Sequence, residues 1–276
     1  MIKIFLSVRN RLAITKKCIH ALKEHSRILN SIYVYDNASN YMVENHFSYF
    51  CKMYMKGYID QICFTSEKST FNAFSKASTC NFFGQQHEQD PQKDTYEFVV
   101  MLDNDIIVTP EWDMNLRAAW KYVRKNKLSD IKAIGQLPGG IKHKGALIKI
   151  NDDIQACTGK LGGSGLWSVR NDFFRDVGFL DLRRLVNHDK KHDQFYWQLM
   201  DRKTNGKPYI MGLKKKLGIH CGRPAGSVCN VLTRHRSNKN RKELIKFEGA
   251  EEKIASTPFK EFFESIKSDK YLIGDW

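Results

Sequence analysis

Two aspartates separated by one residue follow an apolar stretch of the sequence. The run Tyr96–Leu102 reads YEFVVML, and Asp103, Asn104 and Asp105 come directly after it. Carboxylates around such a turn can both reach one divalent cation, and hard oxygen ligands suit Mg²⁺ or Mn²⁺, which also hold phosphates. About one Asp-x-Asp pair is expected by chance in a chain of this length, and an ordinary turn is the alternative. The position after a strand favours a metal site.

A second polar group ends another short strand. Ile32–Tyr35 is β-prone, and Asp36 and Asn37 open the turn-rich cluster that follows it. Strands of this kind alternate with helical stretches along the first half of the chain, which is typical of βαβ units in a mostly parallel sheet. Ligands bind such sheets at the carboxyl ends of the strands. The sequence therefore predicts that both polar groups lie at one edge of an α/β sheet.

The other elements are predicted from hydrophobic spacing and turn residues. Strands are expected over residues 2–8, 32–35, 61–64, 96–102, 166–169 and 216–220. Helices are expected over residues 12–25, 41–56, 111–127, 172–177 (capped by Asn171), 191–200 and 247–268. Loops are expected over residues 84–95, 135–145 and 222–243.

Composition limits the class of protein. The chain has 276 residues, of which 42% are hydrophobic, so it can bury a core and is not disordered. It has no run near the roughly 20 apolar residues of a membrane span, and no cleavage site follows its short apolar N-terminus. Its seven cysteines include no C-x-x-C pair, which indicates reduced thiols. We therefore expect a cytoplasmic protein without a transmembrane segment.

The net charge of +15 is concentrated in two parts of the chain. Residues 201–246 carry 13 Lys and Arg against two acids, and residues 1–30 carry seven against one. A focused basic field favours a polyanionic partner, which is nucleic acid, an anionic membrane surface or the phosphates of a substrate. A solvated lysine-rich surface is the alternative.

Three motifs in this order resemble the nucleotide-sugar glycosyltransferases of the GT-A fold, especially glycosyltransferase family 2. The motifs are IKIFLSVRNR followed by a helix, then IYVYDNAS, then FVVMLDNDIIV. SVRNR also resembles the corresponding motif of the animal galactosyltransferases. The resemblance spans residues 2–222 and implies a nucleotide-binding half over about 1–110 and an acceptor-binding half over about 111–222. A basic loop and a helical extension over 223–276 would follow.

The resemblance continues into the second half of the chain. The segments Gly162–Leu166 and Gly178–Asp181 are similar to the acceptor-side strand and helix of the family. Asp193 matches the second acid of an acidic pair, which is the family's general base, and His192 stands where the first acid is found. Asp189 is the other candidate for the base.

The resemblance also implies a role for each remaining site residue. A metal ion, Mn²⁺ or Mg²⁺, would be held by Asp105, with Asp103 and His220 as further ligands, and would neutralise the leaving nucleoside diphosphate. Asp36 would accept hydrogen bonds from the uracil or ribose of a UDP-sugar, and transfer would invert the anomeric carbon. The expected donor-binding residues are Ser7, Arg9, Arg11, Asp36, Asn37, Asp103, Asn104, Gly163 and Arg223.

Three acceptor hypotheses remain open. The first, which we favour, is a hydroxymethylated base in phage-type DNA, with Trp167, Tyr196 and Trp197 as stacking partners or, alternatively, as core residues. The second is a bacterial surface glycan or lipid-linked saccharide, with peripheral contact to anionic headgroups. The third is a nucleic-acid-binding module without catalysis. Nucleotidyl transfer is a further possibility, but the sequence has no Gly-rich signature loop near its N-terminus to support it. The expected phosphate contacts are Lys214, Lys215, Lys216, Arg234, Arg236 and Arg241.

Overall fold

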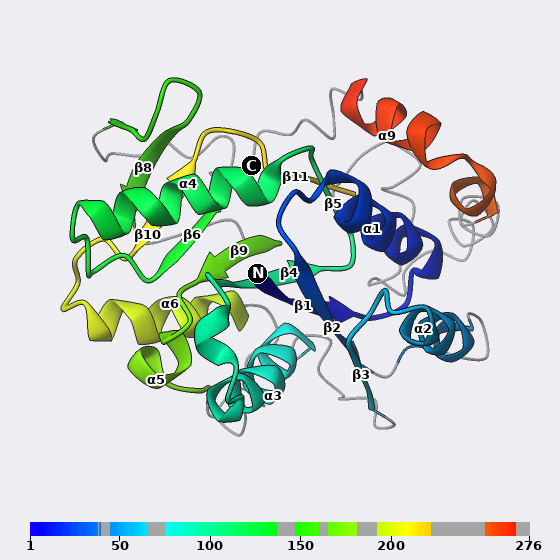
Figure 1. Ribbon diagram of the computed structural model, residues 1–276, viewed down its shortest axis with the longest axis horizontal. Coiled ribbons are helices and arrows are strands. Elements are labelled where there is room, and N and C mark those ends of the chain that lie inside the picture. Colours follow the sequence, from blue (N-terminus) through cyan, green and yellow to red (C-terminus); the bar gives the residue numbers. More distant parts are fainter. Residues whose placement is uncertain are drawn as a thin grey trace, which may run out of the picture.

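The fold is seen in a computed structural model (Figure 1). It describes residues 1–37, 39, 45–65, 75–136, 147–159, 165–180, 192–221 and 252–268, with the backbone alone at 75, 76, 192–195 and 197. None of the helices in these ranges combines the length and apolarity that a bilayer crossing needs.

A nine-stranded sheet in the order β3-β2-β1-β4-β9-β6-β10-β8-β7 forms the centre of the molecule. Its strands are β1 Ile2–Val8, β2 Asn30–Asn37, β3 Gln61–Thr65, β4 Val99–Asp103, β6 Ala133–Gln136, β7 Leu147–Lys149, β8 Gln155–Gly159, β9 Leu166–Val169 and β10 Ile210–Leu213. The first four strands are parallel, whereas β9 lies antiparallel to both β4 and β6. A separate antiparallel pair joins β5 Ile106–Val108 to β11 Gly218–His220. The predicted α/β sheet is confirmed.

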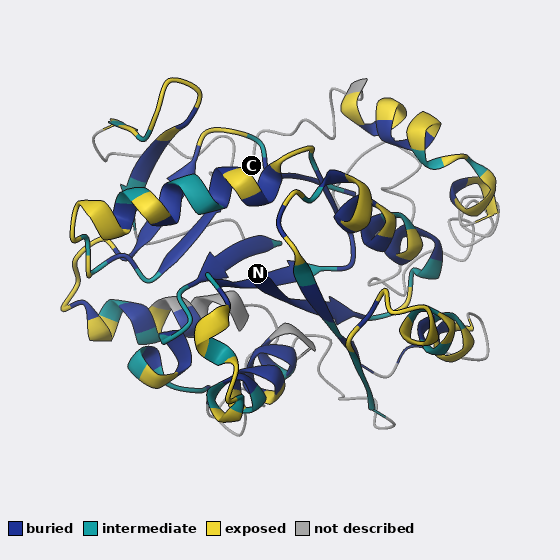
Figure 2. Ribbon diagram, viewed as in Figure 1, coloured by how far each residue is buried: buried dark blue, intermediate teal, exposed yellow. Residues whose placement is uncertain are grey.

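Helices cover both faces of the sheet (Figures 1 and 2). The helices are α1 Leu12–His25, α2 His46–Met55, α3 Ser75–Gln89, α4 Trp112–Lys125, α5 Phe173–Val177, α6 His192–Lys203 and α9 Phe259–Ser268, with a 3₁₀ turn, η1, at Lys93–Thr95. One buried cluster joins the sheet to α1, α2, α4 and α9, and a second joins it to α3, α5 and α6. The chain is therefore a three-layer α/β/α structure.

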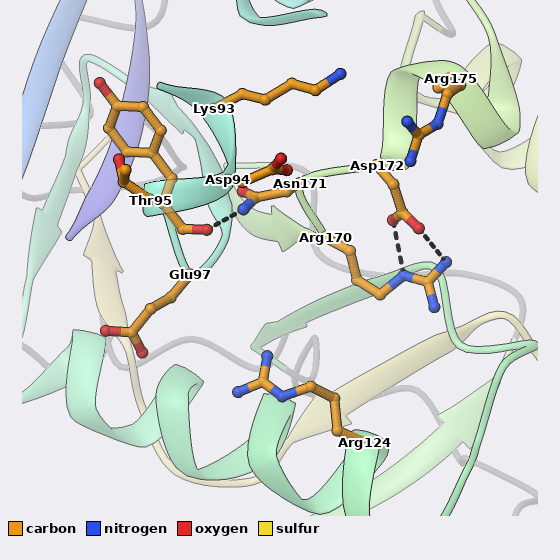
Figure 3. A pocket seen from close by; sticks show the side chains of 10 residues that line it. Lys93, Asp94, Thr95, Glu97, Arg124, Arg170, Asn171, Asp172 and Arg175 are labelled. Atoms are coloured by element: carbon orange, nitrogen blue, oxygen red, sulfur yellow. Dashed lines mark hydrogen bonds and ion pairs between the residues drawn. The ribbon is translucent and has the colours of Figure 1, made fainter. Parts of the chain in front are cut away.

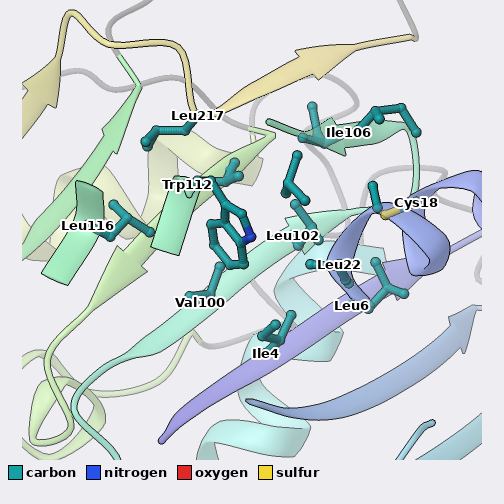
Figure 4. Close-up of a cluster of buried hydrophobic side chains, with 14 of the residues drawn as sticks. Ile4, Leu6, Cys18, Leu22, Val100, Leu102, Ile106, Trp112, Leu116 and Leu217 are labelled. Atoms are coloured by element: carbon teal, nitrogen blue, oxygen red, sulfur yellow. The ribbon is translucent and has the colours of Figure 1, made fainter. Parts of the chain in front are cut away.

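The alternation of side chains along β1 explains why both faces are covered. Ile4 and Leu6 belong to the first cluster, together with Val100 of the neighbouring strand β4 (Figure 4), whereas Phe5 points into the second. Strands buried on both faces read as continuous apolar runs, as parallel strands in α/β proteins do. This is why the first half of the sheet was recognisable in the sequence.

The expectation of a loop over residues 84–95 is wrong for its first part, because α3 continues to Gln89. The last turns of α3 bury a glycine and a histidine, which in the sequence look like part of a polar loop. At Gly84 an added Cβ would lie 2.6 Å from the ring of Phe174, so the missing side chain permits close packing on α5. His87 is fully buried, and its Nε2 lies 3.1 Å from the carbonyl oxygen of Asn171.

The predicted cap of α5 is also wrong. Asp172 is the N-cap residue and makes no side-chain cap bond, and the Asn171 amide donates to the carbonyl of Tyr96 instead. Four strands of the second half, β6, β7, β8 and β10, were not predicted. The C-terminal helical segment was expected, and its Phe262 and Phe263 pack in the first cluster against α1.

Candidate active site

The carboxyl ends of three parallel strands bring the predicted polar residues to one edge of the sheet. In the strand register, Ser7 of β1 lies beside Asp103 of β4, and Val8 lies beside Asp36 of β2. Asn104 and Asp105 form the turn that leads from β4 into β5. The sequence prediction that both groups share one edge is confirmed.

Asp105 lies at this edge, and each oxygen of its carboxylate faces a different nitrogen-bearing side chain. Arg11 Nη1 lies 2.6 Å from Oδ2, and His220 Nε2 lies 3.3 Å from Oδ1. The antiparallel pairing of β11 with β5 brings His220 there, and the Cys221 amide donates to the Asp105 carbonyl at 2.7 Å. Two residues 115 positions apart in the sequence, both predicted as metal ligands, therefore meet.

The charge state of Asp105 follows from these neighbours. Burial alone would raise its pKa, but His220 and Arg11 outweigh burial and hold the pKa of Asp105 well below its usual range. The carboxylate is therefore ionised at neutral pH. It presents a fixed negative charge at the end of the sheet.

Asp36 is the opposite case. It is fully buried, its Oδ1 accepts a hydrogen bond from the Ser39 amide at 2.9 Å, and its Oδ2 has no hydrogen-bond partner among the described residues. Burial raises the pKa of Asp36, and the hydrogen bonds from Ser39 and the charge of nearby His46 oppose this only in part. Next to it, the buried Asn37 amide nitrogen also lacks a partner within the described ranges. Asp36 and Asn37 are consecutive residues at the carboxyl end of β2, where side chains alternate between the two faces of the sheet, and each leaves a buried polar atom that a ligand could complete.

The side chains that meet at Asp105 fit a small divalent cation. Adjacent ligand atoms of an octahedral ion lie roughly 3 Å apart at ligand distances of about 2.1 Å, and Asp105 Oδ1 and His220 Nε2 are 3.3 Å apart. Carboxylate oxygen and imidazole nitrogen are a donor pair that Mn²⁺ accepts. Asp103 is half-buried at the neighbouring strand end, but the described residues contain no group of three His, Cys, Asp or Glu side chains close enough to share an ion. Other ligands would have to be water and substrate phosphate.

Two predicted donor-binding residues have structural partners here. The Asn104 amide donates to the Asn10 carbonyl at 3.0 Å and to Thr15 Oγ1 at 2.8 Å, so it positions the turn between β1 and α1. The Ser7 hydroxyl accepts from Thr79 Oγ1 at 3.1 Å. Sequence reasoning missed Asn10, Thr15 and Ser39, since single polar residues in loops carry no spacing signal.

The remaining predicted site residues are placed only in part. Asp193 lies in the first turn of α6, and its side chain is outside the description. Lys214 and Lys215 are exposed between β10 and β11, while Lys216 is half-buried and burial lowers its pKa. Gly163, Asp189, Arg223, Arg234, Arg236 and Arg241 lie outside the described residues.

The expectation that Trp167 and Tyr196 could stack on an extruded base is wrong. Each side chain is 2% exposed, and their rings pack 5.9 Å apart in the second core cluster. The Tyr196 hydroxyl donates to Asn81 Oδ1 at 2.9 Å, which ties α6 to α3. Both residues serve the core, which was the stated alternative.

A polar cavity lies at the other end of β4 and is separate from this site (Figure 3). Several of the charged side chains that line the cavity form ion pairs within the protein. Arg170 pairs with Asp172, Lys93 pairs with Glu88, and Glu97 pairs with Arg117. Asn171 Oδ1 is a buried oxygen of its lining without a hydrogen-bond partner among the described residues, but none of the predicted site residues lines the cavity, so it is not the candidate active site.

Comparison with known proteins supports the fold. No family model and no curated protein matches the sequence. Residues 1–349 of S. aureus TarS match the structure with a TM-score of 0.51 and 11% identity, over 97% of this chain and 78% of that chain. The same TarS fragment was also solved in complex with UDP.

Two further solved structures match at similar levels. The mannosyltransferase PcManGT from Pyrobaculum calidifontis, in complex with GDP-Man and Mn²⁺, gives a TM-score of 0.51 at 9% identity, over 92% of this chain and 69% of that chain. GalNAc-T7 with UDP, GalNAc and Mn²⁺ gives 0.53 at 10% identity, over 97% of this chain and 53% of that chain. The expectation from the sequence motifs is confirmed at the level of architecture: the chain has the GT-A fold of nucleotide-sugar glycosyltransferases.

Proposed function

We propose that this protein is a glycosyltransferase that moves a sugar from a nucleoside-diphosphate sugar to a hydroxyl group, with help from Mn²⁺ or Mg²⁺. The observation that carries the proposal is that two carboxylates in different environments lie at the same edge of the sheet. Within the part of the chain that the structure describes, Asp36 has a buried oxygen without a hydrogen-bond partner, and Asp105 is ionised beside His220. The similar structures hold UDP or GDP-mannose, and two of them hold Mn²⁺, which supports the same use of this edge.

The nucleoside end of the donor fits Asp36 and Asn37. A buried carboxylate oxygen without a partner requires a donor, which uracil N3–H or a ribose hydroxyl supplies. The Asn37 amide nitrogen, which has no partner among the described residues, requires an acceptor such as a uracil carbonyl. UDP-sugar is therefore the proposed donor.

The diphosphate end of the donor fits Asp105, His220 and the arginines at the end of β1. Asp105 and His220 would hold the cation, with Asp103 close by, and the bound cation supplies positive charge to the leaving diphosphate. Guanidinium groups such as Arg11 match phosphate oxygens in bidentate fashion. Arg9, Gly163 and Arg223 are proposed as further donor contacts on the resemblance alone.

The chemical step is a single displacement. The acceptor oxygen forms a bond to the anomeric carbon, the bond from that carbon to the diphosphate oxygen breaks, and its electron pair stays with the diphosphate. Asp193 takes the proton of the acceptor hydroxyl. Attack from the face opposite the leaving group inverts the anomeric carbon.

For the acceptor we propose a hydroxyl carried on a polyanion, with a hydroxymethylated DNA base as the favoured case. The support is the basic field, of which Lys214 and Lys215 are exposed. The burial of Trp167 and Tyr196 removes them as support for DNA. A bacterial surface glycan or lipid-linked saccharide is the second candidate, and it uses the same charge against anionic headgroups.

A nucleotide-release assay tests the proposal. Purified protein is incubated with each common nucleoside-diphosphate sugar and Mn²⁺, with and without hydroxymethylated DNA. We expect release of UDP from one UDP-sugar, loss of release in EDTA, and loss in an Asp105→Asn variant. The matched control is Asp94→Asn, which removes an exposed carboxylate at the far end of β4. No release from any donor under any condition would leave the non-catalytic nucleic-acid-binding module as the better account.

A further inference from the structure

The contact between Arg11 and Asp105 has a consequence for the cation site, given the proposed function. The guanidinium lies 2.6 Å from Asp105 Oδ2, and the two side chains are 16% and 11% exposed. The same carboxylate is the strongest candidate ligand for the divalent cation. The positive side chain of Arg11 therefore occupies one of the two carboxylate oxygens of Asp105 that a cation would need.

The position of Arg11 is fixed by its backbone. Asn10 and Arg11 both adopt left-handed backbone conformations, with φ of 52° and 62°, which residues other than glycine rarely adopt. Several hydrogen bonds hold this turn. The backbone N–H of Asn10 donates to Ser39 Oγ at 2.8 Å, and the side-chain amide of Asn104 donates to the backbone carbonyl of Asn10. The backbone N–H and the hydroxyl of Thr15 both donate to the backbone carbonyl of Arg11 at 2.9 Å. An uncommon conformation with this many restraints is typical of functional sites.

The turn also connects the two ends of the proposed donor site. The Ser39 hydroxyl that accepts from Asn10 belongs to the residue whose amide donates to Asp36 Oδ1. Hydrogen bonds thus link Asp36 through Ser39 to Asn10, and the next residue in the chain, Arg11, pairs with Asp105. Arg11 is placed by the same residues that shape the nucleoside end.

Two kinds of partner compete for Arg11. In the structure, its acceptor is Asp105 Oδ2. A bound diphosphate offers several oxygens, for which guanidinium is the better-matched donor. When Arg11 turns to the diphosphate, Asp105 loses its guanidinium neighbour, and Oδ2 becomes available to a cation in addition to Oδ1.

We propose that Arg11 is a positioning residue that keeps Asp105 occupied until the nucleoside diphosphate binds, and so makes cation binding depend on the nucleotide. The protein then binds the free divalent cation poorly, and binds cation and nucleotide cooperatively. Ligand couplings of this kind change affinity by about 5- to 150-fold.

The test measures Mn²⁺ binding rather than turnover. Water proton relaxation reports Mn²⁺ bound to a macromolecule, and it is recorded for wild type and Arg11→Gln, with and without UDP. Without UDP we expect Arg11→Gln to bind Mn²⁺ at least fivefold more tightly than wild type. With saturating UDP we expect this advantage to disappear, because wild-type Arg11 is then engaged by the diphosphate.

Two control variants separate the specific contact from general charge. Arg11→Lys keeps a cation at the same position and should bind free Mn²⁺ as weakly as wild type. Lys16→Gln removes one positive charge from the exposed side of α1, where its ammonium lies over the Tyr49 ring, and should leave Mn²⁺ affinity unchanged. Thermal melting of each variant checks that the turn still folds.

The outcomes distinguish this inference from the function on which it rests. Equal Mn²⁺ affinities for wild type and Arg11→Gln, with UDP-dependent binding intact in both, would overturn the role of Arg11 and leave the glycosyltransferase proposal standing. Tighter binding in Lys16→Gln as well would also overturn it, in favour of overall charge. If neither protein binds Mn²⁺ with or without UDP, the donor site itself is refuted and the inference falls with it.

Discussion

Replacing Asp36 by Asn should stabilise the free protein and weaken nucleotide binding. The wild-type carboxylate is fully buried with one oxygen that has no partner among the described residues. An unmade hydrogen bond of this kind costs about 1–3 kcal/mol. The amide keeps the acceptor for Ser39 and removes the charge, although its own nitrogen stays unpaired, so we expect a gain of about 1 kcal/mol at pH 7. For a chain of this size that is a rise in Tm of roughly 2–4 °C.

The pH dependence of this effect has a definite sign. Folding raises the pKa of Asp36 above its value of roughly 3.9 in an unfolded chain. At pH values between the unfolded-state pKa and the folded-state pKa, the native protein therefore binds the proton of Asp36 more tightly than the unfolded chain does. Wild-type stability therefore falls as the pH rises through that interval. The amide does not titrate, so the advantage of the variant is full at neutral pH and disappears near pH 4.

Two assays check the prediction together. Calorimetric melting at pH 4 and pH 7 measures the stability difference, and titration with UDP and Mn²⁺ measures affinity, which should fall about 10- to 100-fold through loss of a hydrogen bond to a charged acceptor. Asp60→Asn is the matched control. Asp60 Oδ2 accepts a hydrogen bond from the Ile32 amide at 2.7 Å, at the other end of β2. Unchanged UDP affinity in Asp36→Asn, or a lower Tm at pH 7, would refute the assignment of Asp36 as an unfilled ligand group.

Three other changes have clear expected outcomes. Asp105→Asn should lower the free energy of unfolding by about 3–5 kcal/mol, because it leaves the largely buried Arg11 guanidinium without its carboxylate. Since the pKa of Asp105 is held low, this contribution is present above about pH 4 and is lost as the pH falls further, which acid unfolding curves will show. Gly84→Ala should cost about 1–3 kcal/mol in urea unfolding, since the new methyl would lie 2.6 Å from the Phe174 ring, and a neutral result would show that α3 and α5 pack more loosely. If the exposed Lys214 and Lys215 contact phosphates, their joint replacement by Gln should reduce the slope of log DNA affinity against log salt by roughly two, measured by anisotropy; an unchanged slope, or no DNA binding at low salt, points to the surface-glycan acceptor.

The sequence was most informative where one physical signal dominated. The apolar runs of β1, β2 and β4 are long and β-prone, and the polar residues after them could be placed at one edge because parallel strands share a direction. His220 was identified through the resemblance, which implies a metal ligand after a short strand. Its pairing with Ile106, which brings it to Asp105, is a tertiary contact that no local pattern encodes.

Other features were missed because their residues look polar or irregular. The end of α3 packs through Gly84 and His87, which the sequence presents as part of a polar loop. Strands β6 and β10 are four residues each and contain glycine, so their pattern is too short to separate from a turn. The ion pair of Arg11 with Asp105 spans 94 positions and depends on a left-handed turn at a non-glycine residue, which sequence preferences disfavour.

The central claim is that Asp36 and the Asp105–His220 pair form one donor site, and a crystal grown with UDP and Mn²⁺ tests it most directly. The anomalous difference map should show a single strong manganese peak about 2.0–2.2 Å from an Asp105 carboxylate oxygen and from a nitrogen of His220. The uracil or ribose should donate a hydrogen bond to Asp36. A manganese peak away from Asp105, or a uridine bound elsewhere with Asp36 Oδ2 still unpaired, would contradict the account.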